Sequence, residues 1–445
     1  MKKIIQTLKN IWSIEDLKSK IIVTVSMIFV YRLGTFIVLP GIDPNRLSAL
    51  SGNAKGGALG LIDAFSGGAF SQASILALGI MPYISASIFM QLMTILIPQM
   101  QKVQKEGASG QKKINQWTRY LTVIVTFVQA YAYVTYLRNF GRDAMVDSFS
   151  AYFWLTTPII LTAGTLFVMW LGEKITDKGL GNGTSLIIMI GILARLPRSI
   201  KQEWDAKVTE GAGGMLKFVI EVGVLVAIIM GLIILSQGTR KVPVNYAKQI
   251  VGNRQFGGAR QFLPLKVIAS GVMPIIFAQA IMFLPTIFAN FDSTKGIAKL
   301  FSDPRDFSHM LIYAVIVIGF TFLYTALIFN PKQIADDLKR NNGFIPGVKP
   351  GQPTADYIGS VMDKITLPGA VLLAVVGILP GFAQRMGITQ GFASFFGGTS
   401  LLIMVQVILD TLQQIETQLL MRQYDGLMKS GRIQGRQSSV SNAVI

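Results

Sequence analysis

Residues 67–92, GGAFSQASILALGIMPYISASIFMQL, decide the fold of this chain. The stretch is long and apolar enough to lie in a lipid bilayer. Yet Gly68, Gly79 and Pro82 interrupt it, and serine and glutamine side chains are scattered along it. Polar groups that face lipid are costly, so in membrane proteins they face protein or water instead. The stretch therefore predicts a membrane helix that lines an internal, partly wet space.

The composition of the whole chain predicts a membrane protein. Of its 445 residues, 51% are hydrophobic and 14% are charged, whereas about 25% are charged in a typical soluble protein. Apolar runs of roughly 18 residues or more recur from one end to the other, which indicates many membrane spans. The chain contains no cysteine, which excludes disulfides, thiolate metal sites and cysteine nucleophiles.

We predict ten membrane spans, each flanked by charged residues, glycine or proline. They divide at the charged loop 197–214 into five and five, so the two halves have opposite orientations and any structural repeat is inverted. The predicted fold is an all-α membrane protein of two inverted five-helix halves, 1–200 and 201–445, with a pathway between them. The spans cover residues 20–39, 71–98, 117–137, 153–172, 183–199, 215–236, 267–288, 309–330, 366–382 and 394–421.

The basic residues predict the orientation. Most of the 41 Lys and Arg residues fall on the cytoplasmic side when the N-terminus is placed in the cytoplasm, as the positive-inside rule requires. Ten spans then leave the C-terminus, a polar tail, in the cytoplasm as well. The N-terminal segment MKKIIQTLKNIWSIEDLKSK is basic and amphipathic, and no small-residue cleavage site follows it. We interpret it as a segment on the membrane surface rather than a cleaved signal or transit peptide.

Two cytoplasmic loops, 237–266 and 330–365, are long and basic. The first contains VPVNYA and FLPLK and no acidic residue, and the second contains GFIPGVKPG. Loops this long are usually functional or disordered, and these are too apolar for disorder. An anchor for topology explains any one basic residue, but a basic protrusion favours a phosphate-bearing partner, such as ribosomal RNA, or an acidic motor surface. The candidate docking residues are Arg240, Lys241, Lys248, Arg254, Arg260, Arg340 and Lys349.

Almost the whole chain resembles the SecY family of protein-conducting channels. The motifs that carry the resemblance are SGGA, ALGIMPYISASI, KEGASGQKKINQWTRY, GTLFVMWLGEKITDKGLGNGTSLII, PVNYAKQ, LPLK, YTALIFNP and FGGTSLLI, in family order. The resemblance implies a channel, not an enzyme, that threads unfolded secretory chains across a bacterial plasma membrane or releases apolar segments sideways into lipid. The implied partners are SecE-type and SecG-type small membrane subunits, with a SecA ATPase or a ribosome on the basic face. No cofactor, metal or catalytic residue is implied.

The resemblance also implies roles for particular residues. A ring of isoleucines would form an apolar collar that excludes water and ions, and its β-branched side chains are stiff. A plug helix near 57–68 would close the channel, and a lateral gate would form where spans two and three face spans seven and eight. Glycine and proline in spans two and seven would soften helices that must part. The ring is Ile80, Ile84, Ile188, Ile276 and Ile403; the plug includes Leu59, Leu61, Ile62 and Phe65; and the gate includes Ser85, Gln91, Ile268 and Pro274.

Three positions depart from the family pattern. Lys349 replaces the arginine of the G-x-R-P-G turn, which keeps the charge but loses the planar guanidinium fork. Asn253 stands in a frequent arginine pair, and Ile268 stands where an asparagine often lies opposite Gln91. The last change predicts a more apolar gate that opens less readily for hydrophilic chains, unless Ser270 or Gln279 compensates.

The residues permit one other class of function, a secondary transporter of a small solute. Such a transporter needs convergent charges or broken spans at the midplane and a buried coupling acid. Asp410 and Glu221 are the only candidates for that acid within the spans. The long basic loops have no role in a transporter, so the sequence favours the channel.

Overall fold

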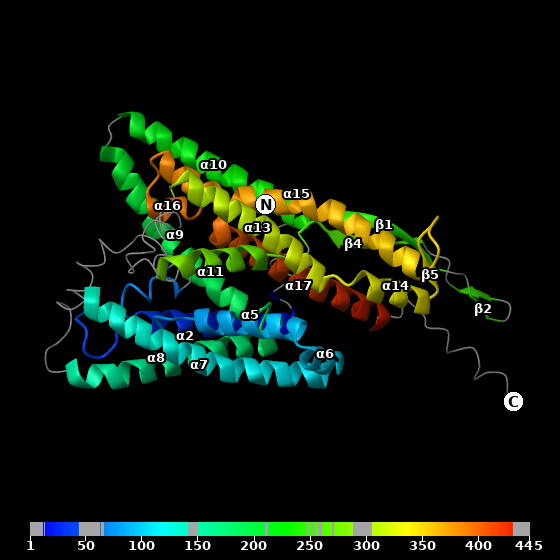
Figure 1. Cartoon of the computed structure of the whole chain (residues 1–445), viewed down its shortest axis with the longest axis horizontal. Coiled ribbons are helices and arrows are strands. Elements are labelled where there is room, and N and C mark those ends of the chain that lie inside the picture. The colour runs from blue at the N-terminus through cyan, green and yellow to red at the C-terminus, as the bar shows by residue number, and fades with distance from the viewer. Residues whose placement is uncertain are drawn as a thin grey trace.

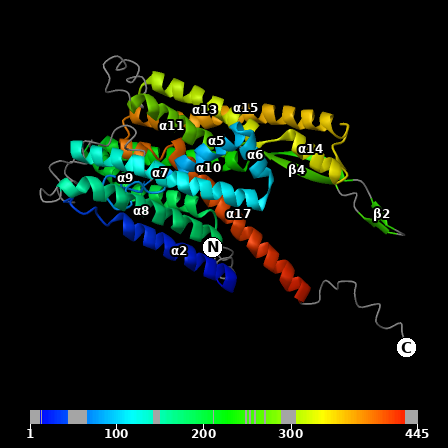
Figure 2. The same cartoon turned by 60° about the horizontal axis from the view of Figure 1, so that its bottom comes forward.

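The structure is a computed structural model. It describes residues 12, 14–43, 63, 66–140, 150–209, 212–246, 249–251, 254–256, 260–268, 271–287 and 305–429. Most of the described residues are helical, and Figure 1 shows most helices of the first half on one side of a bundle and most helices of the second half on the other. The C-terminal end of α17 extends beyond the bundle (Figure 2).

Among the described residues, seven helices are long and apolar enough to cross a membrane. The helices α5 (Met81–Leu96) and α6 (Pro98–Lys105), which bend by 104° at the break between them, make an eighth if the pair is counted as one span. Two predicted spans are not among these helices. The helix α2 (Glu15–Thr35) carries three basic side chains, which is too many charges for a span, and α11 (Met273–Ile287) has only 15 residues, which is too short. With these two, each of the ten predicted spans has a helix. The seven are α7 (Ala108–Phe140), α8 (Ser150–Lys178), α9 (Gly183–Thr209), α10 (Ala212–Gln237), α13 (Phe307–Ile328), α15 (Gln352–Arg385) and α17 (Gly398–Lys429).

Predicted span two is only partly helical, which corrects the prediction of one helix over 71–98. Residues 67–80 form successive turns, and α5 begins at Met81. Glycine permits these turns, because Gly67, Gly68 and Gly79 have φ values of 67°, 93° and 54°, a region that glycine enters without strain. The apolar character of the stretch was read correctly, but its backbone conformation was not.

The turn segment 66–80 is embedded in protein. A β-bridge joins Val38 to Ser74, and the Ile75 amide donates to the Ile37 carbonyl at 2.9 Å. The Ser74 hydroxyl donates to the carbonyl of Gly34 in α2 at 3.0 Å. Non-helical backbone is tolerated at membrane depth only where protein satisfies its hydrogen bonds. The serines of this stretch therefore serve the fold, by replacing helical hydrogen bonds.

Two short motifs each occur twice, and every copy lies at the start of a helix. GIMP (79–82) before α5 returns as GVMP (271–274) before α11, and both glycines have positive φ, 54° and 62°. GTSLII (183–188) begins α9 and returns as GTSLLI (398–403) at the start of α17. The sequence analysis missed this repetition. Each pair has one member in each half, which supports the predicted inverted repeat.

The prolines of the repeated motif begin helices rather than bend them. Pro82 is the second residue of α5, and Pro274 is the second residue of α11. In the first turn of a helix, the missing N–H of proline costs no hydrogen bond. The expectation that these prolines soften spans two and seven is therefore wrong.

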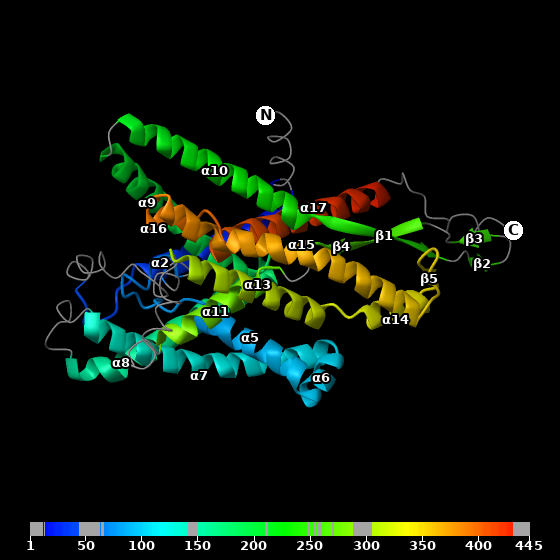
Figure 3. The ribbon, with the colours of Figure 1, turned by 45° about the horizontal axis from the view of Figure 1, so that its top comes forward.

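A small β-sheet extends the bundle at one end, so the chain is mostly helical rather than all-α (Figure 3). Strands β4 (Arg260–Lys266), β1 (Thr239–Tyr246) and β5 (Gly343–Phe344) form a sheet in that order. A separate hairpin pairs β2 (Gln249–Val251) with β3 (Arg254–Phe256). Strands β1 and β4 belong to the first basic loop, and β5, which follows the helix α14 (Pro331–Arg340), belongs to the second. The sheet therefore joins the two basic loops. One face of the sheet packs against α15. There its buried side chains, Val242, Val244 and Leu265, cluster with Ile358 and Met362.

Candidate functional site

The five isoleucines predicted to form the ring lie in one hydrophobic cluster, called here the isoleucine cluster. Ile80, Ile188 and Ile403 are only 2%, 7% and 5% exposed, and Ile84 and Ile276 are partly buried against them. Ile80 directly precedes α5, and the other four lie on α5, α9, α11 and α17. The fold thus collects side chains from both halves of the sequence into one apolar contact region.

The repeated motif explains this convergence. Ile84, Ile188, Ile276 and Ile403 each follow the first glycine of their motif by five residues. The same register pairs Ile80 with Val272, and Val272 also packs against the isoleucine cluster. Sequence reasoning missed Val272, although the match between GIMP and GVMP would have revealed it.

The predicted plug residues Leu59, Leu61, Ile62 and Phe65 lie outside the described residues. Within residues 59–65 of the predicted plug, Asp63 alone is described. Its Oδ2 lies 3.3 Å from an Nη of Arg195 in α9, and its Oδ1 accepts a hydrogen bond from the Ser71 amide at 2.8 Å. The start of the turn segment is thus fastened to α9 by a charge pair.

One of the predicted gate residues has a partner that was not expected. The Tyr324 hydroxyl of α13 donates to Oε1 of Gln91 in α5 at 3.1 Å. Ile268 lies in a turn before α11 and not within a helix. Ser85 is exposed and donates to the Met81 carbonyl of its own helix at 3.1 Å. The polar contact between spans two and eight therefore involves Tyr324, and no sequence signal singled out this tyrosine.

The ring of Tyr324 is buried next to a pair of phenylalanine rings. The ring centroids of Phe277 and Tyr324 are 6.1 Å apart, and the rings of Phe277 and Phe320 stack at 5.6 Å. Tyr324 itself is 8% exposed. A hydroxyl in such apolar surroundings is costly unless it is hydrogen-bonded, so the bond to Gln91 anchors α13 to α5.

The predicted docking residues gather on and beside the small sheet. Arg240 and Lys241 are exposed on β1, Arg340 is exposed at the end of α14, and Lys349 is exposed in the following turn. The Lys349 carbonyl accepts from the Thr354 hydroxyl at 2.8 Å, which holds this turn to α15. The structure thus brings both loops together into one basic surface. Arg254 and Arg260 begin β3 and β4, and Lys248 lies outside the described residues.

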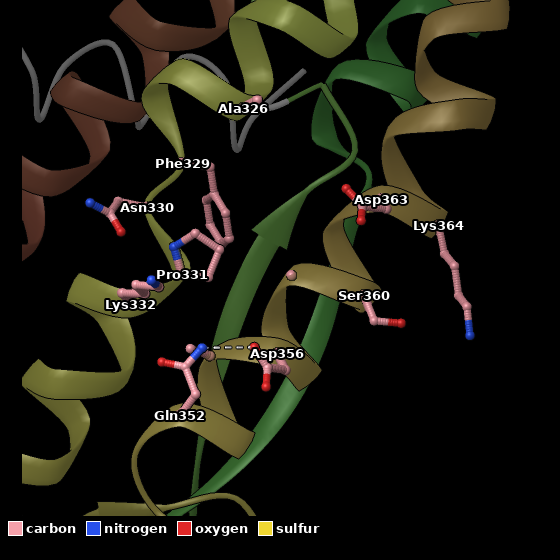
Figure 4. Close-up of a pocket in the computed structure, with 12 residues that line it drawn as sticks. Ala326, Phe329, Asn330, Pro331, Lys332, Gln352, Asp356, Ser360, Asp363 and Lys364 are labelled. Carbon is pink, nitrogen blue, oxygen red and sulfur yellow. Dashed lines mark hydrogen bonds between the residues drawn. The ribbon is translucent and has the colours of Figure 1, made fainter. Parts of the chain in front are cut away.

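A cleft of about 750 Å³ opens next to this sheet, between the end of α13, the start of α14 and α15 (Figure 4). Phe329 and Pro331 line it with apolar surface. Gln352 Nε2 donates to Asp356 Oδ1 across one turn of α15 at 3.0 Å. The cleft shares no residue with the isoleucine cluster.

The two acids that a transporter would need do not converge. Asp410 is exposed on α17 and accepts a hydrogen bond from Gln406 Nε2 at 3.0 Å. Glu221 of α10 lies elsewhere, with its Oε1 3.2 Å from Lys207 Nζ.

Lys207 lies in a buried ionic network at the end of α9. Its Nζ is 3.6 Å from Glu203 Oε1 and donates to the Gly387 carbonyl at 3.2 Å. Glu203, which is fully buried, accepts from both the amide and the hydroxyl of Thr389. The network therefore ties α9 to α10 and to the turn after α15.

Residues 74–412 match the protein family described as SecY. The chain is 40% identical over 432 residues to the protein translocase subunit SecY of Streptomyces scabiei, and the match covers 93% of this chain and 97% of that protein. It is 38% identical over 436 residues to the subunit of the same name from Mycobacterium bovis, with the same coverage. The chain belongs to the SecY family.

Solved structures agree with SecY membership at the level of the fold. "The structure of a protein conducting channel" matches with a TM-score of 0.61 at 15% identity, over 93% of this chain and 94% of the other. Sec61 in the canine ribosome-channel complex matches with a TM-score of 0.57, also at 15% identity and with the same coverage. The prediction of a helical membrane protein with the SecY channel fold is thereby confirmed.

The SecY match includes every helix that contributes to the isoleucine cluster through the repeated motif, as well as both basic loops. Asp63 lies before the matched residues. The expectation that the chain is a channel subunit rather than an enzyme is confirmed by its SecY membership.

Proposed function

We propose that this chain is the pore-forming subunit of a bacterial protein translocase. It passes unfolded secretory polypeptides across the plasma membrane and releases apolar segments sideways into lipid. The observation that carries the proposal is the isoleucine cluster, to which four helices from the two halves contribute, in a chain whose SecY relatives are named protein translocase subunits.

The chemistry of the cluster suits this role. Apolar walls offer a passing polypeptide no fixed hydrogen-bond partner, so no particular sequence is retained. A narrow apolar constriction also excludes water and ions when no polypeptide fills it. Stiff β-branched side chains keep its dimensions defined. The isoleucine cluster thus serves as an apolar collar that fits closely around a translocating polypeptide.

The basic surface serves the driving partner. Arg240, Lys241, Arg340 and Lys349 form an exposed positive surface, which suits ribosomal RNA phosphates or the acidic face of a SecA ATPase. Two similar solved structures contain a ribosome, one with canine Sec61 and one with the yeast Ssh1 complex. SecE-type and SecG-type small membrane subunits complete the translocase, with both termini of this chain in the cytoplasm.

A disulfide experiment tests the proposal, because the chain has no native cysteine. A single cysteine is placed at Ile84 or Ile276, and a secretory precursor with one cysteine is stalled in transit by a folded C-terminal domain. We expect disulfides between the precursor and both positions, since the polypeptide must pass the collar. The control is a cysteine at Ile234, which is 72% exposed on α10. Leu225 is unsuitable as a control because it packs against the isoleucine cluster.

A positive result requires disulfides at the two collar positions and none at Ile234. If translocating membranes give no disulfide at either isoleucine, polypeptide does not pass the collar. The pore assignment is then wrong, and uptake of small solutes by the purified protein becomes the next assay.

Removal of one hydroxyl tests the lateral gate. Tyr324→Phe deletes the hydrogen bond between α13 and α5 and keeps the aromatic ring beside Phe277. One such bond contributes about 1 kcal/mol net, so we expect roughly fivefold more lateral release of a segment of borderline apolarity into lipid. The measurement is the fraction of that segment that is inserted rather than translocated. Tyr120→Phe, at an exposed position of α7, is the control, and equal fractions in both variants would contradict a gate at Gln91 and Tyr324.

A further inference from the structure

One polar contact joins two helices of the second half beside the isoleucine cluster. The Thr399 hydroxyl, at the start of α17, donates to Oε1 of Gln279 in α11 at 3.1 Å. We propose that this hydrogen bond positions Ile276 and Ile403 in the collar, which makes Gln279 and Thr399 positioning residues of the channel. The inference rests on the proposed channel function and explains how one side of its collar is held in place. The sequence analysis considered Gln279 only as a substitute for the missing asparagine of the gate.

The bond lies in apolar surroundings, where a polar group is costly unless it is hydrogen-bonded. Thr399 is only 1% exposed. Its neighbour Leu401 and the neighbours of Gln279, Ile275 and Ala278, are fully buried in the hydrophobic cluster that α11, α13 and α17 share. A single polar contact in an apolar core can fix how two helices align, as a buried asparagine does in coiled coils. The bond therefore favours one alignment of α11 with α17.

The spacing on each helix carries this alignment to the collar. Ile276 precedes Gln279 by three residues, and Ile403 follows Thr399 by four. Residues three or four apart are neighbours on the surface of a helix. Spans seven and ten run in opposite directions in the predicted topology, so a step back along α11 and a step forward along α17 lead the same way. The bond thus lies about one helical turn from both isoleucines, and both belong to the isoleucine cluster.

The corresponding residues of the first half are joined differently. The register of the repeated motifs pairs Gln279 with Ser87 and Thr399 with Thr184. The Thr184 hydroxyl donates to Oδ1 of Asn182, in the turn before its own helix, at 2.6 Å, and a hydroxyl has one hydrogen to donate. The second-half side of the collar is therefore fastened by a bond that the equivalent threonine of the first half does not make. That side stays fixed, and the first-half side adjusts to the passing polypeptide.

Variants of matched shape test the bond in the intact translocase. Gln279→Leu and Thr399→Val each remove it and keep the apolar packing. The measurement is KCl conductance in planar bilayers while a stalled precursor fills the collar, because the gap that remains depends on where the isoleucines lie. We expect each variant to raise this conductance by about fivefold, the population change that corresponds to one net hydrogen bond. The double variant should conduct no more than either single variant, because both remove the same interaction. Thr399→Ser, which keeps the hydroxyl, should conduct as the unmodified translocase does.

A second bond of the same kind separates positioning from stability. The Ser236 hydroxyl of α10 donates to Oε1 of Gln406 in α17 at 2.7 Å, without involving α11. Ser236→Ala should lower the unfolding midpoint about as much as Thr399→Val does but leave the conductance unchanged. The inference is refuted if Thr399→Val leaves the conductance unchanged, or if Ser236→Ala raises it equally. If precursor disulfides still form at the collar in that case, this inference alone has failed; if they do not, the proposed channel function has failed as well.

Discussion

Lys207→Met is expected to lower the free energy of unfolding by about 3–5 kcal/mol, the usual effect of removing one partner from a buried ion pair. The variant leaves Glu203 and Glu221 without their ammonium partner, and Glu203 is fully buried. Methionine retains the apolar stem of lysine, so lost packing contributes little. The measurement is thermal unfolding in detergent, followed by tryptophan fluorescence, because Trp204 lies next to this network on α9.

Two comparisons isolate the charge effect. Lys201→Met changes an exposed lysine of the same helix and should leave the unfolding midpoint nearly unchanged. Adding Glu203→Gln and Glu221→Gln to Lys207→Met removes the uncompensated charges and should recover much of the loss. A Lys207→Met protein as stable as the Lys201→Met protein would show that the network contributes no net stability.

Opening the collar to water is expected to have the largest effect on conductance. Ile84→Ser with Ile276→Ser replaces two apolar side chains of the isoleucine cluster, one from each half of the chain, and each apolar side chain is worth about 1.5–3 kcal/mol in transfer from water. Because dewetting closes an apolar constriction, we expect the resting KCl conductance of the translocase to rise by about a hundredfold. The measurement is made in planar bilayers without precursor.

The matched control for the collar is Ile84→Val with Ile276→Val, which keeps the β-branched shape and the apolar character. This variant should conduct only slightly more than the unmodified translocase. Equal conductance of the serine and valine variants would mean that the isoleucine cluster does not seal the pathway, whatever else it stabilises.

Much of the fold could be predicted because membrane spans are recognised by length and apolarity alone. Those two properties cannot separate a helix from a buried irregular segment, so residues 67–80 were taken as part of a helix. The glycines of this stretch were the available signal for turns, and the structure shows them with positive φ. Likewise, the loops around Val242 and Leu265 were predicted to be ordered, but the pairing of β1 with β5 joins segments about 100 residues apart and leaves no local pattern.

Residues could be predicted to lie together where a motif fixed them, as for the five isoleucines. They were missed where only a tertiary contact defines them, as for Tyr324 with Gln91 and Arg195 with Asp63. Val272 is an intermediate case, because a comparison of the chain with itself would have revealed it.

The repeated motif also sets the electrostatics of the collar. Ile84, Ile188, Ile276 and Ile403 each lie within the first six residues of their helix. The N-terminal end of a helix carries a partial positive charge, equivalent to about half an elementary charge, that acts within its first turn. Ile84 and Ile276 are the fourth residues of α5 and α11, whereas Ile188 and Ile403 are the sixth residues of α9 and α17, so the ends of α5 and α11 act most directly on the isoleucine cluster. A potassium ion or proton at the collar is repelled by this positive field and is also poorly solvated by the apolar side chains. A polypeptide backbone has no net charge, so the field does not repel it. In the proposed channel, these helix ends would add discrimination by charge to discrimination by size.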